Sequence, residues 1–231
     1  VAIQYGNPWI DLGLLKSTDG GDSWEQTIIW EHPYPNNNGY YPTDTFYCVD
    51  GAHHLAFDTE NKVHVVFGIT KIVAGNMPVI TWFPTVDGIG YWNEDRPTFS
   101  NNLNALNPYD HPDSELVENY SLIGWTQDVD NNGTIELLDD WGEYYLGLSS
   151  MPQICIDDFD RITVIWSSVT ETFDNGLQNY RHLWYRCSPN DGNWWGEFND
   201  MNNYLIHSMY ECVYPSVAEK ANDAIHLVFQ M

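Results

Sequence analysis

The chain has 231 residues and a formal net charge of -25, from 33 Asp and Glu against 8 Lys and Arg. This balance argues against nucleic acid and anionic membrane surfaces as partners, because both require a basic footprint. It favours solubility and divalent-cation binding, although most of the acids are expected on a solvated loop surface. No apolar run approaches the roughly 18 residues of a membrane-spanning helix, so no membrane insertion is expected within this sequence.

The composition predicts a β protein. Trp, Tyr and Phe number 11, 15 and 9, and helix-forming periodicity is scarce. The length suits one large all-β domain or two small ones. Because the sequence begins at Val1 and stops at Met231 inside an apolar run, we expect it to be a piece of a longer protein.

The four cysteines show no C-x-x-C spacing, so a zinc site is not expected. They are Cys48, Cys155, Cys187 and Cys212. Two disulfides, in any of three connectivities, and free buried thiols both remain open.

The first recognisable stretch is a predicted hairpin turn, Ser17 to Trp24, with the sequence STDGGDSW. Ser17 and Asp19 can accept hydrogen bonds from the backbone N–H groups of a tight turn. Gly21 supplies a positive-φ position that a Cβ would resist. Trp24 begins the outgoing strand and can pack back over the turn.

A recurring segment predicts a two-stranded hairpin three times. Its copies run from Leu55 to Phe67, Ile154 to Trp166 and Val217 to Phe229. Each has a short strand, a polar turn and an apolar strand that ends on an aromatic residue. A second turn motif follows the middle copy, with Ser188, Asn190, Gly192 and Trp195 in the places of Ser17, Asp19, Gly21 and Trp24. Thr85 to Trp92 is either a degenerate copy of this motif or a plain hairpin.

The turn motif resembles the Asp-box, or BNR repeat, of sialidases and many secreted β-propellers. In that family the motif is structural and joins the third and fourth strands of a blade. The resemblance and the repeat together predict an all-β fold, a β-propeller of four-stranded blades of which this chain covers about three. The expected parts are a partial blade at about 1–32, a blade at about 53–99, an insertion at about 101–148, a blade at about 149–200 and a half blade at about 214–231.

The predicted insertion contains the most specific chemical signal. Asp128 to Asp139 matches an EF-hand or dockerin-type calcium loop, with Gly133 at the sharp turn. The expected ligands are Asp128, Asp130, Asn132, Thr134 through its backbone carbonyl, Glu136 and Asp139. We expect a structural Ca²⁺ that braces the insertion; the alternative is an acidic Asn/Gly turn without metal.

No catalytic residues are predicted. A retaining sialidase needs a Tyr nucleophile with a Glu, an acidic acid/base and three Arg on the substrate carboxylate. Arg96, Arg161, Arg181 and Arg186 form no recognisable triad. His64 and His226 occupy the same repeat position, and the side chains of the His53–His54 pair would point to opposite faces of a strand, so neither pair predicts a metal site.

The first hypothesis is a secreted or cell-surface propeller that acts as a non-catalytic binding, adhesion or assembly module. A glycan or another surface protein is the expected partner, with Trp9, Tyr40, Tyr41, Trp194 and Trp195 available for stacking on sugar rings. The alternatives are a sialidase-like glycoside hydrolase with its catalytic residues outside this sequence, and a passive spacer in a surface assembly. The overall pattern resembles large surface proteins of Gram-negative bacteria with a type IX secretion route, which implies an extracellular location and contact with the secretion machinery.

Overall fold

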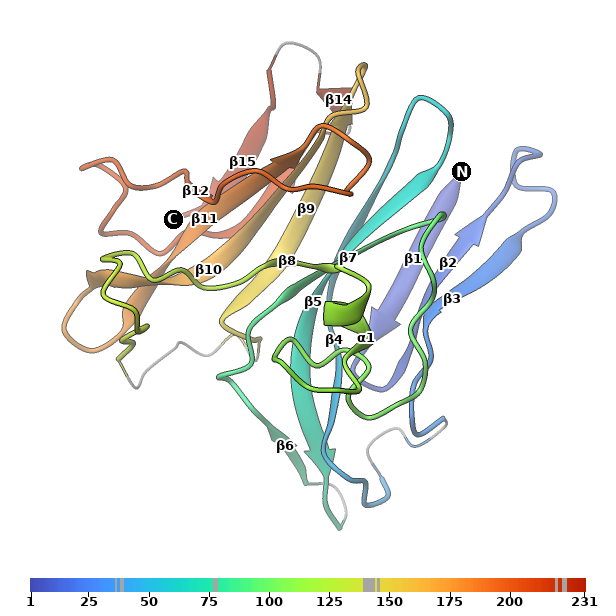
Figure 1. Cartoon of the computed structure of the whole chain (residues 1–231), viewed down its shortest axis with the longest axis horizontal. Helices are drawn as coiled ribbons and strands as arrows, with labels where there is room; N and C mark the ends of the chain where they lie inside the picture. Colours follow the sequence, from blue (N-terminus) through green and yellow to red (C-terminus); the bar gives the residue numbers. More distant parts are fainter. Residues whose placement is uncertain are drawn as a thin grey trace.

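The protein is a set of mainly antiparallel β-sheets that lie side by side, with one short helix, α1 (Glu115–Glu118) (Figure 1). The computed structural model describes residues 1–35, 37, 40–76, 79–138, 144, 146–218, 220–221 and 224–231. The all-β prediction is therefore confirmed. Within the described ranges, no helix has the length and apolar character needed to span a membrane.

The first sheet has the order β1-β2-β3, formed by Ala2–Asn7, Ile10–Lys16 and Glu25–Trp30. The second has the order β4-β5-β7-β8, formed by Phe46–Phe57, Val63–Ala74, Ile89–Asn93 and Leu122–Gly124. A short strand, β6 (Ile80–Trp82), also pairs with β5.

The third sheet has the order β12-β11-β10-β9, formed by Asn199–Asp200, Asn179–Ser188, Ile162–Asp174 and Ser149–Asp157. The two residues of β14 (Lys220–Ala221) pair with β9 in parallel. The last sheet consists of β13 (Val213–Val217) and β15 (Leu227–Gln230).

The three sequence repeats form three hairpins with the same register. Leu55 lies opposite Val65 in β4–β5, Ile154 opposite Val164 in β9–β10, and Val217 opposite Leu227 in β13–β15. The first strand of each hairpin also has a residue with positive φ, followed by a register shift. These residues are Gly51, Met151 and Tyr214, with φ of 94°, 56° and 51°. Met151 and Tyr214 share one kind of bulge, three residues before Ile154 and Val217, whereas Gly51 lies four residues before Leu55 in a longer irregularity.

The core consists of layers between successive sheets. Trp30 of the first sheet and Phe46 and Phe67 of the second share one buried cluster. Tyr91 of the second sheet and Trp166 of the third share the next. A third cluster joins Ile165 and Leu183 to Val217 of the last sheet. Because side chains alternate along a strand, Trp166 and Ile165 reach different layers and β10 is buried on both faces.

The segment predicted as a loop insertion, 101–148, is in part regular structure. It contains α1, whose N-cap Ser114 accepts a hydrogen bond from Val117 N at 3.1 Å. It also contains β8, which pairs with β7 and forms the edge of the second sheet. The second sheet begins at Phe46 and takes its last strand from residues 122–124, so its bounds differ from the 53–99 expected for a blade. Pairing with β7 makes residues 122–124 a strand of this sheet. At three residues, β8 is too short for its apolar periodicity to be recognised in the sequence.

The segment Thr85 to Trp92 is not equivalent to the two turn motifs. It leads into β7 and lies before the third main strand of its sheet. The Ser188 turn instead follows β11, the third strand counted from β9, and the Ser17 turn follows β2, the middle strand of its sheet. The Thr, Asp and Trp of this segment match the turn motif in sequence, but they do not occupy its position relative to the strands.

All four cysteines are free thiols, which resolves the open alternative. Cys48, Cys155 and Cys212 are buried and Cys187 is exposed. Cys155 and Cys187 both lie opposite Thr163, one on each side of β10. Their backbones are separated by two strand spacings of about 4.8 Å each. This separation exceeds the roughly 7 Å between Cα atoms that a disulfide can bridge.

Candidate metal centre

The predicted calcium loop follows β8 and lies beside β10. Of its expected ligands, Asp128, Asp130, Asn132, Thr134 and Glu136 are described, and Asp139 lies outside the described residues. The loop is largely exposed, so its conformation depends on its own hydrogen bonds and on its contacts with β10.

The first half of the loop wraps around two carboxylates. Asp128 Oδ2 accepts from Gly133 N at 2.8 Å, and Asp130 Oδ1 accepts from Asn132 N at 3.1 Å. Gly133 has φ of 96° and Asn131 has φ of 58°, so two left-handed residues make the bend. The backbone therefore encloses Asp128 and Asp130 in the way a cation-binding turn requires.

The second half supplies further oxygens to the same region. Asn132 Nδ2 donates to Asp130 Oδ2 and to Glu136 Oε2, each at 3.1 Å. The Thr134 hydroxyl donates to Asn132 Oδ1 at 2.7 Å and to Glu136 Oε1. The hydrogen bonds from Thr134, and then from Asn132, hold the pKa of Glu136 below its usual range. An ionised carboxylate is the form that a cation requires.

A buried residue that the sequence analysis missed completes the group. Glu171 on β10 is only 2% exposed. Its Oε2 accepts from Val129 N at 2.8 Å and its Oε1 from Glu136 N at 2.7 Å. One carboxylate thus fastens two points of the loop, Val129 and Glu136, to the sheet. A signal existed: Glu171 follows the apolar run Ile162 to Trp166 in one strand, and a carboxylate buried in a sheet requires polar partners.

The carboxylate oxygens of Asp128, Asp130 and Glu171 lie within 4.8 Å of one another. In the part of the chain that the structure describes, none of the three forms an ion pair with Lys, Arg or His. Converging hard oxygens without a basic partner suit Ca²⁺, which takes six to eight such ligands. The residues present therefore fit the ion that the sequence predicts.

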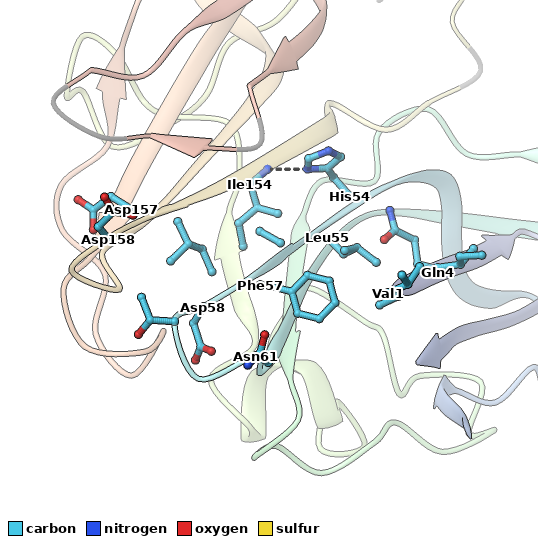
Figure 2. Close-up of a pocket in the computed structure, with 15 residues that line it drawn as sticks. Val1, Gln4, His54, Leu55, Phe57, Asp58, Asn61, Ile154, Asp157 and Asp158 are labelled. Atoms are coloured by element: carbon cyan, nitrogen blue, oxygen red, sulfur yellow. Dashed lines mark hydrogen bonds between the residues drawn. The ribbon is translucent and has the colours of Figure 1, made fainter. Parts of the chain in front are cut away.

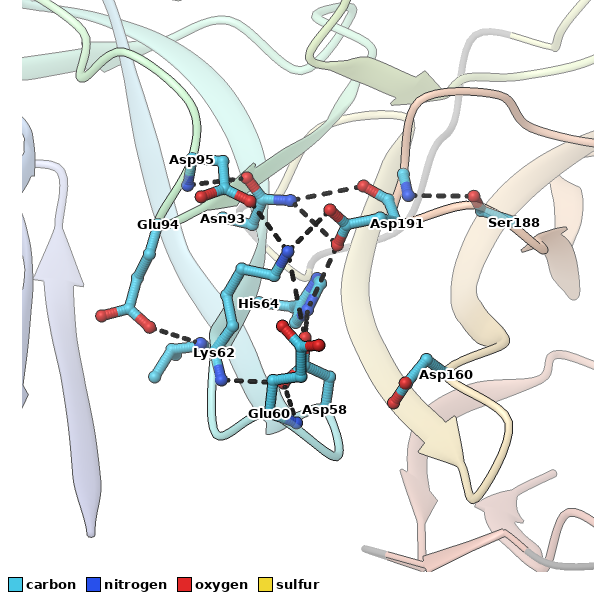
Figure 3. A network of polar contacts seen from close by, with 12 residues as sticks. Asp58, Glu60, Lys62, His64, Asn93, Glu94, Asp95, Asp160, Ser188 and Asp191 are labelled. Atoms are coloured by element: carbon cyan, nitrogen blue, oxygen red, sulfur yellow. Dashed lines mark hydrogen bonds and ion pairs between the residues drawn. The ribbon is translucent and has the colours of Figure 1, made fainter.

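A second acidic group, Asp58, His64 and Asp191, does not have this character (Figure 3). Lys62 Nζ lies 2.7 Å from Asp191 Oδ2 and 2.8 Å from Asp95 Oδ2. Burial opposes the charge on Lys62, but its bonds to Asp191 and Asp95 raise its pKa. His64 is buried and its Nδ1 is 2.7 Å from the Tyr91 hydroxyl, while burial lowers its pKa. An ammonium already neutralises this group, so we assign it no metal.

The Ser17 turn has a defined set of hydrogen bonds. Ser17 Oγ accepts from Gly21 N at 2.8 Å, and Asp19 Oδ1 accepts from Ser23 N at 2.9 Å. Gly21 has φ of 102°, and Trp24 Nε1 donates to Gly21 O at 3.1 Å. Bonds from Ser23 and Ser17 hold the pKa of Asp19 well below its ordinary value.

The Ser188 turn uses the same bonds between equivalent atoms. Ser188 Oγ accepts from Gly192 N at 3.0 Å, and Asn190 Oδ1 accepts from Trp194 N at 3.0 Å. This turn docks on the second sheet, where Arg96 Nη2 donates to Gly192 O at 2.8 Å. The ring of Trp195 packs edge-on against Tyr91, with ring centroids 5.2 Å apart. The second turn is therefore an inter-sheet contact as well as a hairpin.

The four arginines do not converge on one site. Arg96 and Arg186 donate to backbone carbonyls around the Ser188 turn, and Arg161 pairs with Asp157 in the β9–β10 turn. Arg181 is 2% exposed and donates to Gly147 O at 2.7 Å and to Leu148 O at 3.1 Å. Each of the four guanidinium groups therefore binds a carbonyl or carboxylate of the fold itself.

Buried acids lie near Arg181. Asp50 accepts from Ala52 N at 2.8 Å and from the Ser150 hydroxyl, which links β4 to β9. A Cβ on Gly68 would overlap the Asp50 carboxylate, so the absence of a side chain at Gly68 makes room for Asp50. Burial raises the pKa of Asp50 to about 6 and also raises that of Asp87. Asp87 also accepts from Thr126 N at 2.7 Å, just ahead of the calcium-type loop. Among the described residues, Arg181 forms no ion pair with Asp50 or Asp87.

The aromatics proposed for stacking on sugars fall into two sets. Tyr40, Tyr41 and Trp194 are 55%, 69% and 59% exposed. Trp9 packs instead against Phe46, and Trp195 against Tyr91. Only the first set is available to a ligand.

Comparison with known proteins leaves the family open. No family model matches the chain, and no curated protein matches it. One similar solved structure is an ulvan lyase, described as a new polysaccharide lyase family, PL25, bound to a GlcA(1-4)Rha3S saccharide. The TM-score is 0.43 at 10% identity, over 93% of this chain and 42% of that one. The chain thus spans less than half of that protein's length, and a likeness of this size shows neither its family nor its function.

Proposed function

We propose that the chain is part of an extracellular or cell-surface β-propeller whose blades are the four sheets described above. The three hairpins in identical register, and the packing of each sheet on the next, support this arrangement. The Ser17 and Ser188 turns follow the equivalent strands of two sheets, as a repeated blade requires.

Within this propeller, Ca²⁺ braces the segment between β8 and β9. The observation that carries this proposal is Glu171, which bonds Val129 and Glu136 of the loop and lies beside Asp128 and Asp130. Asp128, Asp130, Asn132, Glu136 and Glu171 would hold the ion. Its charge would offset the repulsion between their carboxylates and fasten the loop to β10.

Calcium titration of the protein by isothermal calorimetry should give one binding site. Asp128→Ala and Asp130→Ala should each abolish the heat, and Glu171→Gln should weaken binding at least about tenfold, because each removes a charged ligand. At a calcium concentration of about 100 Kd, the unmutated protein should gain about 2.7 kcal/mol of stability against urea.

Asp158→Asn serves as the matched control, since it removes one acidic charge from a turn outside the loop. It should leave Kd unchanged. No heat in the unmutated protein would end the calcium proposal, and an unchanged Kd for Glu171→Gln would remove Glu171 from the ligand set.

The function that these features support best is a non-catalytic module that binds a glycan or another surface protein. All four arginines hold backbone or turn structure, which gives no support to the alternative of a sialidase-like glycoside hydrolase within the described residues. The exposed Trp194 ring lies on the Ser188 turn and is available for stacking.

A glycan array probed with the labelled protein should give binding that Trp194→Ala lowers at least about fivefold, because stacking area is lost. Trp24→Ala, at the equivalent turn of the first sheet, is the control for a general loss of surface aromatics. Release of 4-methylumbelliferone from its sialoside by the unmutated protein would instead support the hydrolase. No binding to any glycan would favour a protein partner or a spacer role.

A further inference from the structure

Strand β1 has one unpaired edge. Val1 N donates to Ser17 O at 3.1 Å, and Ser17 N donates to Val1 O at 2.8 Å, so these residues form a hydrogen-bonded pair. Such pairs alternate along an antiparallel ladder, and the next is Ile3 with Leu15. The N–H and C=O groups of Ala2 and Gln4 therefore point away from β2. No described strand pairs with them.

The corresponding strands of the other sheets have a partner on this edge. Val1 opposite Ser17 matches Ile162 opposite Ser188, because Ser17 and Ser188 begin equivalent turns. Strand β10 is paired on its other side with β9, and β5 with β4. Strand β1 also contacts β4 as β5 contacts β9. By this equivalence, β1 corresponds to the second strand of each of the other two sheets, and no described strand pairs with it in the place of the first.

The sequence of β1 agrees with this assignment. Its apolar residues and its aromatic follow the spacing of the second half of the repeat. In the three segments these positions are Val1, Ile3 and Tyr5; Val63, Val65 and Phe67; and Ile162, Val164 and Trp166. In the second and third sheets, the first half of the repeat forms the strand that pairs with this edge, β4 and β9 respectively.

A cavity of about 730 Å³ lies along the unpaired edge (Figure 2). Residues 1–4 form one side, residues within 54–61 run along it, and residues within 154–158 lie opposite. Four consecutive residues line it, Val1 and the first three of β1, as expected where a strand presents its edge rather than one face. Leu55, Phe57 and the half-exposed Ile3 make much of the lining apolar.

We propose that this groove is the docking site of a peptide strand, namely the first half of a further copy of the repeat, which pairs with Ala2 and Gln4. Its backbone supplies the hydrogen bonds that the edge lacks, as in strand addition at a sheet edge. Ala2 packs on the cluster shared with the second sheet, so the residues of the added strand opposite Ala2 and Gln4 face Leu55 and Phe57 across the groove. The inference depends on neither calcium nor glycan binding.

The test joins a copy of residues 52–62 directly ahead of Val1. In the second sheet this segment forms the second half of β4 and the turn that follows it. The turn ends at Lys62, one residue before Val63, which is the equivalent of Val1. The added strand should protect the Ala2 and Gln4 amides from hydrogen exchange at least about tenfold and raise Tm by several degrees. The Ile3 amide, already paired with β2, is the internal reference.

The matched control carries Pro at the two positions of the added segment that copy His54 and Ala56, because proline lacks the N–H group that would bond the carbonyls of Gln4 and Ala2. It should give neither protection nor a rise in Tm. A folded fusion protein with unprotected Ala2 and Gln4 amides would overturn the proposal, and so would equal protection by the control segment. Calcium titration of the same fusion protein is a separate measurement, so failure of strand docking is distinguishable from failure of the calcium proposal.

Discussion

Gly192→Ala should lower the free energy of unfolding by about 2–5 kcal/mol. Gly192 has φ of 75°, where a residue with a Cβ is strained by about 1–2 kcal/mol. The added Cβ would also overlap the Tyr91 ring across the contact between the second and third sheets. Overpacking of this kind costs about 1–3 kcal/mol more. Urea denaturation followed by tryptophan fluorescence measures the loss.

Gly21→Ala provides the matched comparison. Gly21 occupies the equivalent turn position with φ of 102°, but the nearest side-chain atom to its added Cβ would be Trp24 Cζ2 at 3.8 Å. That variant should lose only the strain, about 1–2 kcal/mol. Equal losses for the two variants would contradict the docking of the Ser188 turn on Tyr91.

Asp50→Asn should stabilise the protein at pH 7.5 by up to about 3 kcal/mol. Burial raises the folded-state pKa of Asp50 from 3.8 to about 6, so the folded protein holds this proton more tightly than the unfolded chain. A folded-state pKa about two above the unfolded value corresponds to about 3 kcal/mol of folding free energy. This contribution is fully present below about pH 4 and is lost as the pH rises through about 6. Asparagine stays uncharged throughout and keeps an acceptor for Ala52 N.

The measurement is urea unfolding of both proteins at several values between pH 4 and pH 8. The difference in stability should be smallest at pH 4 and should grow until about pH 6–7. Asp22→Asn, an exposed acid on the Ser17 turn, controls for the removal of one charge from a strongly acidic protein. A constant difference across the pH range would show that Asp50 does not titrate as its buried position requires.

Local sequence was informative wherever adjacent residues decide the structure. The spacing of Leu55, Val63 and Phe67 predicted a hairpin because strand alternation and turn chemistry act over a few residues. The bonds around Gly21 and Gly133 likewise join residues within five positions of each other. The irregularities at Gly51, Met151 and Tyr214 carry no common sequence signal, because only one of the three residues is glycine, the usual sequence marker for positive φ.

By itself, the sequence determined the all-β class, the hairpin repeat and the acidic loop whose spacing favours Ca²⁺, since these depend on periodicity and short-range geometry. Tertiary structure decided which distant groups meet. It brought Glu171 to the loop, placed Asp50 over Gly68, gave residues 122–124 to the second sheet and left one edge of β1 unpaired. The physical reason is that a contact between sheets depends on the packing of whole layers, and that packing leaves no fixed spacing along the chain.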